Sequence, residues 1–147
     1  MPPKLNRKLM KRMEEAFNTG NLALVDELVA PDHVDRTPFP GTGRDRNGLK
    51  KQITALRKAF PDGKFRIVKM VAEGEAVAYS WKLVGTQKGP LLGRDATNKK
   101  ITFFGNGFVT FKDGKMIGHE ATDDIGGAAA GKDVGGMLTK LGYPAEV

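Results

Sequence analysis

The sequence predicts an α+β fold in which three N-terminal helices pack on a curved antiparallel sheet. Apolar side chains recur with the helical period of 3.6 residues up to Phe60, and they alternate with the period of two of a strand after Gly63. Helices that precede a run of strands are typical of an α+β architecture. The length of 147 residues is that of one domain, so we expect residues 1–147 to form a single domain.

The helices are expected at residues 4–18, 22–29 and 47–60, where the apolar side chains gather on one side. Gly20 suits the left-handed position that follows a helix, and it separates the first two helices. Pro61-Asp62-Gly63 ends the third helix. We therefore expect a helical hairpin followed by one more helix.

Strands are expected at residues 33–37, 64–72, 76–86, 100–112 and 115–122. Asp113-Gly114 is a strong hairpin signal, and Glu73-Gly74-Glu75 makes a second short turn, so the strands after Gly63 pair antiparallel. Gly105 and Gly107 lie inside a strand and allow it to bend strongly. A curved sheet closed by helices either encloses an apolar pocket or is filled by its own side chains, and the sequence leaves both open.

Alternation in the strand at residues 76–86 assigns its side chains to two faces. One set should face the helices: Val77, Tyr79, Trp81 and Leu83. The other set should face solvent or a cavity: Ala78, Ser80 and Lys82.

The composition excludes several classes of function. The formal net charge is +7, and the chain has no cysteine, which excludes disulfides, thiolate nucleophiles and thiolate zinc sites. His33 and His119 are too few for a histidine-rich metal site. Glu14 and Glu15 interrupt the basic face of the first helix, and no aromatic side chain on that face offers base stacking, so we expect no nucleic-acid partner. No stretch reads as a signal peptide or a membrane span, so we expect a cytoplasmic protein with no membrane partner.

Four ionisable side chains gather near the end of the last expected strand: His119, Glu120, Asp123 and Asp124. On a regular strand His119 and Asp123 share one face, and Glu120 and Asp124 share the other. A carboxylate at the mouth of an apolar pocket has its pKa raised by desolvation toward the range that proton transfer requires. The alternative is a polar strand end at which Asp124 caps a turn. The glycine-rich stretch at residues 126–136 is expected to be a flexible segment.

Four segments, in this order and spacing, are typical of one known family: Phe17-Asn18-Thr19-Gly20 with Ala30-Pro31-Asp32-His33, then Ala59-Phe60-Pro61-Asp62, then Gly85 to Gly93, and last Asp113 to His119 with Asp124 and Leu138 to Gly142. Through these segments the chain resembles the SnoaL-like polyketide cyclase family of the NTF2-like superfamily. The resemblance covers almost the whole chain, and it implies the cone of helices and curved sheet that defines the NTF2-like fold.

The resemblance also implies a chemistry. Asp124 matches the aspartate that acts as general acid/base in an intramolecular aldol condensation, and His119 matches the histidine of the same run. No cofactor and no metal are implied, because flanking carbonyls already activate the carbon acid. Two positions depart from the family pattern: Arg36 stands where many relatives have a histidine, and Glu120 replaces a common tryptophan.

The leading hypothesis is a cofactor-independent cyclase-type enzyme that acts on a small hydrophobic carbonyl compound. Two other classes stay open: a non-catalytic binder of a small apolar ligand, and a basic interaction module. We expect a homodimer formed through the open face of the sheet. The candidate substrate contacts are Arg36, Trp81, Phe104, Asn106, Phe108, Glu120 and Asp123.

Overall fold

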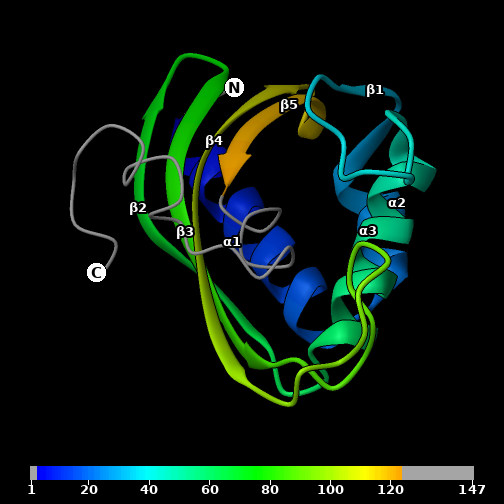
Figure 1. The fold of residues 1–147 in the computed structure, drawn as a ribbon. Helices are drawn as coiled ribbons and strands as arrows, with labels where there is room; N and C mark the ends of the chain where they lie inside the picture. The colour runs from blue at the N-terminus through cyan, green and yellow to red at the C-terminus, as the bar shows by residue number, and fades with distance from the viewer. Residues whose placement is uncertain (1–2, 124–147) are drawn as a thin grey trace, which may run out of the picture.

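The structure, a computed structural model, describes residues 3–123 (Figure 1). In this part of the chain three helices lie in the concave side of a curved five-stranded sheet, as the sequence predicts. The expected flexible segment at residues 126–136 and the candidate base Asp124 lie outside the described residues.

The helices are α1 (Pro3–Thr19), α2 (Leu22–Leu28) and α3 (Arg46–Ala59), so the predicted helices are confirmed with ends displaced by one residue. The side chain of Asn21 caps α2 by accepting a hydrogen bond from the backbone N–H of Ala23, and Asp45 caps α3 in the same way through Gly48. Among residues 3–123 no helix combines the length and the apolar character that a membrane span requires.

The sheet contains β1 (Val29–Asp35), β2 (Lys64–Glu73), β3 (Ala76–Thr86), β4 (Lys100–Lys112) and β5 (Lys115–Asp123) in the order β1-β5-β4-β3-β2. Strands β2 to β5 pair antiparallel, as predicted, and β1 adds to the edge of β5 in parallel. The parallel edge strand brings the end of β1 beside the middle of β5.

Strand β1 begins earlier than the expected residues 33–37. Val29 already has extended backbone angles, so the strand follows α2 without a loop. Pro31 is tolerated because β1 is an edge strand, and the register with β5 is irregular between Val29 and Val34. The proline therefore ends the helix, as expected, but does not prevent the strand.

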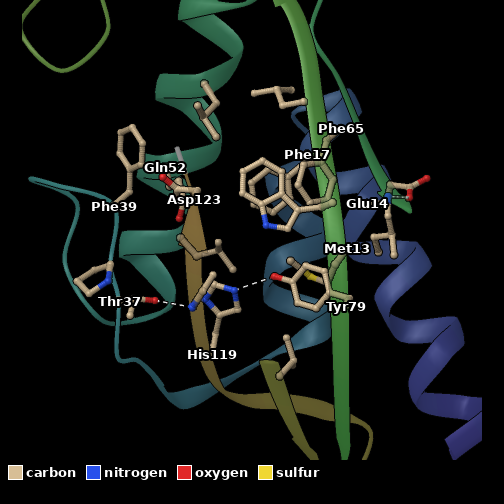
Figure 2. A pocket seen from close by; sticks show the side chains of 18 of the residues that line it. Met13, Glu14, Phe17, Thr37, Phe39, Gln52, Phe65, Tyr79, His119 and Asp123 are labelled. Carbon is tan, nitrogen blue, oxygen red and sulfur yellow. Dashed lines mark hydrogen bonds between the residues drawn. The ribbon is translucent and has the colours of Figure 1, made fainter. Parts of the chain in front are cut away.

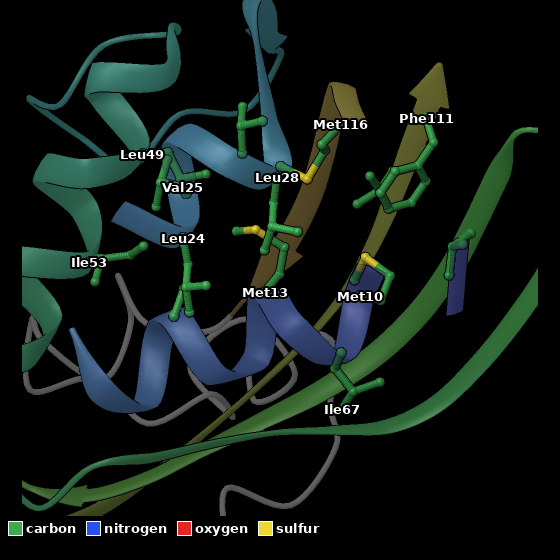
Figure 3. Close-up of a cluster of buried hydrophobic side chains, with 14 residues drawn as sticks. Met10, Met13, Leu24, Val25, Leu28, Leu49, Ile53, Ile67, Phe111 and Met116 are labelled. Atoms are coloured by element: carbon green, nitrogen blue, oxygen red, sulfur yellow. The ribbon is translucent and has the colours of Figure 1, made fainter. Parts of the chain in front are cut away.

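Two clusters of buried apolar side chains join the helices to the sheet. The larger cluster packs α1, α2 and α3 against the inner face, and Figure 3 shows its members around Met13 and Leu28. The smaller cluster gathers around Phe60, Trp81 and Phe103. The inward positions of Val77, Trp81 and Leu83 are confirmed by their burial.

Helix α1 is attached to β2 by side chain to backbone hydrogen bonds. The Asn18 amide donates to the carbonyl of Phe65 at 2.8 Å and accepts from the N–H of Phe65 at 2.7 Å. The carboxylate of Glu14 accepts from the N–H of Ile67 at 2.8 Å. These bonds hold the ring of Phe17 against that of Phe65, with centroids 4.8 Å apart.

Gly105 and Gly107 make room for two aromatic rings of the neighbouring strand. Trp81 pairs with Gly105 and Tyr79 pairs with Gly107, so the four residues point to the same inner face. A Cβ atom at Gly105 would lie 2.4 Å from the Trp81 ring, and one at Gly107 would lie 2.5 Å from the Tyr79 ring. The glycines expected to bend β4 therefore also let the two rings lie across it.

We predict that Gly105→Ala lowers the free energy of unfolding by about 1–3 kcal/mol, because the new methyl group overpacks the inner face. Besides the ring, it would meet the backbone carbonyl of Thr122 at 2.6 Å, which cannot move without disturbing β5. Urea denaturation measures the change. The matched control is Gly118→Ala, where the nearest atoms lie 3.9 Å away and stability should stay within about 0.5 kcal/mol. Equal losses in the two variants would contradict the close approach at Gly105.

Candidate active site in the cavity between helices and sheet

A cavity of about 300 Å³ lies between α1, α3 and the inner face of the sheet (Figure 2). Its wall is mostly apolar and rich in aromatic rings, among them Phe17, Phe65 and Trp81. Phe65 stacks on Phe17 and lies 5.3 Å from Trp81 between ring centroids. An apolar cavity with a few polar groups is the usual form of a small-molecule site.

His119 brings an imidazole to this wall from the middle of β5. Alternation along β5 directs Ala121 and Asp123 to the same side, and all three line the cavity. The His119 side chain is only 16% exposed. The face that the sequence predicts for His119 and Asp123 is thus the cavity face.

Asp35 lies beside His119 because the two residues are register partners in the parallel pairing of β1 with β5. The carboxylate oxygen Oδ2 of Asp35 is 3.3 Å from Nδ1 of His119, and Oδ1 accepts a hydrogen bond from the backbone N–H of Thr37 at 2.9 Å. Burial raises the pKa of the Asp35 carboxyl, but the contact with His119 and the Thr37 hydrogen bond together lower it more. Its pKa therefore lies below the ordinary value, and Asp35 is ionised at neutral pH.

Tyr79 reaches His119 from β3 by crossing β4 over Gly107. Its hydroxyl oxygen Oη is 2.8 Å from Nε2 of His119 (Figure 2). Burial, and to a smaller extent the charge of Asp35, raise the pKa of the Tyr79 hydroxyl, so it stays protonated. Asp35, His119 and Tyr79 thus form one chain of polar groups that come from β1, β5 and β3.

The partners of the two ring nitrogens determine the tautomer of His119. An ionised carboxylate only accepts hydrogen bonds, so Nδ1 of His119 carries the hydrogen that faces Asp35. In the neutral ring Nε2 is then an acceptor, and the protonated hydroxyl of Tyr79 donates to it. The ring therefore presents a basic nitrogen on the cavity side.

Two other charged side chains of the wall are engaged by the protein itself. The Glu14 carboxylate accepts from the backbone of β2 and lies 3.7 Å from the ammonium of Lys11. The Arg57 guanidinium donates to the carbonyls of Gly63 and Pro61 at 2.8 Å and 2.7 Å. Both groups support the fold around the cavity.

His33, the second histidine, is buried in β1 and does not line the cavity. Burial and the nearby His119 lower the pKa of His33, so its ring is neutral at physiological pH. Its Nδ1 atom has no hydrogen-bond partner among residues 3–123. No group of three or more side chains that could ligate a metal occurs in this part of the chain.

The structure brings three of the sequence-derived candidates to the cavity wall: Trp81, His119 and Asp123. The other described candidates do not line the cavity: Arg36, Phe104, Asn106, Phe108 and Glu120. Alternation explains this for β4, because Phe103, Gly105 and Val109 are buried on the inner face, whereas Phe104, Asn106 and Phe108 lie on the exposed outer face. Arg36 and Glu120 are likewise exposed. Contact of these residues with a ligand would require a surface other than this cavity.

Asp35 and Tyr79 are candidate functional residues that the sequence reasoning did not select. The sequence predicts only that Tyr79 faces the helices, and no sequence pattern singles out Asp35. The signal for Tyr79 was available, because a glycine opposite an aromatic residue on paired strands indicates a ring that crosses the strand. The position of Asp35 required the parallel pairing of β1 with β5.

The fold and the cavity agree with the relationship that sequence comparison finds. The family model described as SnoaL-like polyketide cyclase matches residues 7–130. The chain belongs to the SnoaL-like polyketide cyclase family. No curated protein matches this SnoaL-like chain significantly.

Solved structures with the same fold include relatives of this SnoaL-like chain. A protein from Acidithiobacillus ferrooxidans, assigned provisionally as a polyketide cyclase, is 30% identical over 87% of this chain and 93% of its own, with a TM-score of 0.71. IdmH from Streptomyces antibioticus, with the same provisional assignment, is 27% identical over 93% of this chain and 98% of its own, with a TM-score of 0.71. TsrD from Streptomyces laurentii is 22% identical over 88% of this chain and 96% of its own, with a TM-score of 0.79, and shows the shared fold.

Proposed function

We propose that the protein is a cofactor-independent enzyme that catalyses an intramolecular aldol reaction, or a related proton transfer, on a hydrophobic, polyketide-like carbonyl compound. One observation carries the proposal: the wall of an apolar cavity holds the imidazole of His119, whose Nε2 atom is 2.8 Å from the Tyr79 hydroxyl, together with the side chain of Asp123. Membership of the SnoaL-like family supports it.

This reaction needs little from the protein. A hydrogen between two carbonyl groups is already acidic, so a positioned base and a fixed orientation are enough to form the enolate. The apolar wall would exclude water and hold the flat hydrophobic part of the compound. No metal or cofactor is required by this scheme.

We propose His119 and Asp124 as the general acid/base groups, with Asp124 in the role that the family resemblance gives it. Asp123 is the competing carboxylate, because it shares the cavity wall with His119. Trp81 would contact the hydrophobic part of the substrate from the same wall.

A second candidate function is the binding of a small apolar ligand without catalysis. The aromatic wall favours it, because Phe17, Phe65 and Trp81 can hold an apolar molecule whether or not a reaction follows. Binding of a ketone without exchange of its α-protons would distinguish this binding function from the proposed enzyme.

We also propose that two copies of the chain associate through the outer face of the sheet. Val71, Ala78 and Phe108 form one row across β2, β3 and β4, and Val71 and Phe108 are 67% and 43% exposed. Lys69 adds positive charge on the β2 side of this face, and Glu120 adds negative charge on the β5 side. A two-fold axis along the strands would bring the unlike sides of two copies together.

Light scattering should give the intact protein a mass of about twice 15.9 kDa at micromolar concentration, as the apolar row requires. Val71→Glu places a charge in that row and should shift the mass toward the monomer. A wild-type protein that is monomeric at this concentration contradicts the proposed dimer.

The enzyme proposal predicts α-proton exchange in a simple bicyclic ketone. We expect the intact protein to accelerate exchange of the C2 hydrogens of 1-tetralone in deuterated buffer, followed by proton NMR. His119→Gln should lower the rate roughly 100-fold, the scale of a lost general base, with little change in KM. Asp124→Asn should lower the rate to a similar degree.

Asp123→Asn is the matched control for Asp124→Asn, because the two changes are chemically identical and adjacent in the chain. A larger loss in Asp123→Asn transfers the role of the carboxylate to the cavity-wall residue. Calorimetric binding of 1-tetralone without exchange by the wild-type protein would contradict the enzyme proposal and favour the binding function.

A further inference from the structure

Tyr79 and His119 place a hydrogen-bond donor and a base side by side in the cavity wall. The hydroxyl oxygen of Tyr79 and Nε2 of His119 are 2.8 Å apart, and both side chains line the cavity. The predicted acid/base set, His119 and Asp124, includes no donor for the oxygen on which the enolate charge develops. The pair supplies that missing group.

We infer that Tyr79 is a catalytic residue that donates its hydrogen bond to the substrate carbonyl oxygen while Nε2 of His119 takes the α-hydrogen of the same carbonyl. This inference rests on the proposed function. It assigns Tyr79 the role of oxyanion donor and assigns the first proton transfer to His119.

The spacing of the two protein atoms fits the spacing of the two substrate atoms. Bond lengths of 1.23 Å for C=O and 1.52 Å for the adjacent C–C bond place the α-carbon about 2.4 Å from the carbonyl oxygen. The Oη–Nε2 distance of 2.8 Å is close to this value. One carbonyl group can therefore meet both protein atoms at once, within the reach that a general base requires.

The change from the resting state to the reactive state needs only a rotation of the Tyr79 hydroxyl hydrogen. At rest the Tyr79 hydroxyl donates to Nε2 of His119 and occupies its lone pair. An arriving carbonyl oxygen offers a second acceptor, and rotation about the Tyr79 C–O bond redirects the hydrogen to it. The same rotation frees the lone pair of Nε2, so binding of the oxygen activates the base.

The surrounding strands keep both atoms in place. The Tyr79 ring lies over Gly107, where a Cβ would approach to 2.5 Å, so the ring is closely supported by the backbone of β4. The His119 ring is held from its other side by Asp35. Preorganised donors and bases of this kind lose little energy to reorganisation during the reaction.

The proton balance of the reaction closes within this pair. The α C–H bond breaks, its proton moves to Nε2, and the electron pair delocalises onto the oxygen that Tyr79 holds. The imidazolium that results lies between the carboxylate of Asp35 and the enolate. The enolate carbon then forms a bond to a second carbonyl carbon, and the oxygen of that carbonyl takes the proton from Nε2, which restores the neutral imidazole.

The test compares two bicyclic probes that differ by one oxygen atom, 2-naphthol and naphthalene. The hydroxyl of 2-naphthol sits on an sp² carbon, as in an enol, whereas naphthalene offers only the apolar surface. We expect Tyr79→Phe to weaken 2-naphthol binding about 10-fold in isothermal titration calorimetry, the worth of one hydrogen bond. The affinity for naphthalene should change less than about twofold, and this retained binding shows that the variant is folded.

The matched control is Ser80→Ala, which removes a hydroxyl from the next residue of β3, outside the cavity lining. It should leave the affinities for both probes unchanged. In the 1-tetralone exchange assay, Tyr79→Phe should lower kcat by roughly 100-fold with KM almost unchanged, as expected for a donor that acts on the transition state.

The outcomes separate this inference from the proposed function. If the wild-type protein exchanges 1-tetralone, and Tyr79→Phe changes neither kcat nor the ratio of the two probe affinities, the inference alone is wrong. If the wild-type protein prefers 2-naphthol through Tyr79 but exchanges no ketone, the enzyme proposal is wrong and Tyr79 is a ligand-binding donor only. Failure of the wild-type protein to bind either probe contradicts both.

Discussion

The hydrogen bond between Tyr79 and His119 depends on the absence of a side chain at Gly107. Three strands must cooperate for it to form, because Tyr79 belongs to β3 and His119 to β5, and β4 lies between them. Any side chain at Gly107 would meet the Tyr79 ring. The polar chain in the cavity therefore depends on this part of β4.

Asp35 connects this hydrogen bond to the edge of the sheet. The parallel pairing of β1 with β5 places Asp35 opposite His119, and the pairing continues past the strand end through the Arg36 N–H, which donates to the His119 carbonyl at 2.8 Å. The Ala121 N–H then donates to the Thr37 hydroxyl at 2.7 Å. These two hydrogen bonds, one between backbone groups and one to the Thr37 side chain, fix the position of Asp35 along β5. The Asp35 carboxylate in turn fixes the tautomer of His119. The apolar cavity therefore contains a base, His119, with a fixed orientation, and Asp35, His119 and Tyr79 each have a hydrogen-bonding partner.

Periodicity was sufficient to predict most of the fold and part of the site. The helices, the strands β2 to β5 and the shared face of His119 and Asp123 follow from the local periods of 3.6 and two residues, and the structure agrees with them. Alternation alone does not tell which face of β5 lines the cavity. The sequence leaves open whether the space between helices and sheet is a cavity or is filled by side chains. It does not predict the contact of Asp35 with His119, because the two residues are distant in sequence and meet only through the parallel pairing of an edge strand, which no local pattern encodes. Phe104 and Phe108 are also candidate substrate contacts from the sequence, but alternation along β4 directs them to the outer face, where they are 58% and 43% exposed.

The protonation of the two His119 ring nitrogens tests the account most directly. Nitrogen-15 NMR of the labelled intact chain near neutral pH, with signals assigned by their loss in His119→Gln, distinguishes the two atoms. We predict that Nδ1 carries a hydrogen and that Nε2 carries none and accepts the hydrogen bond of Tyr79. We also predict that Asp35→Asn weakens this preference because an amide can also donate to Nδ1. A hydrogen on Nε2 in the wild-type protein, or the same tautomer preference with Asn at position 35, would contradict it.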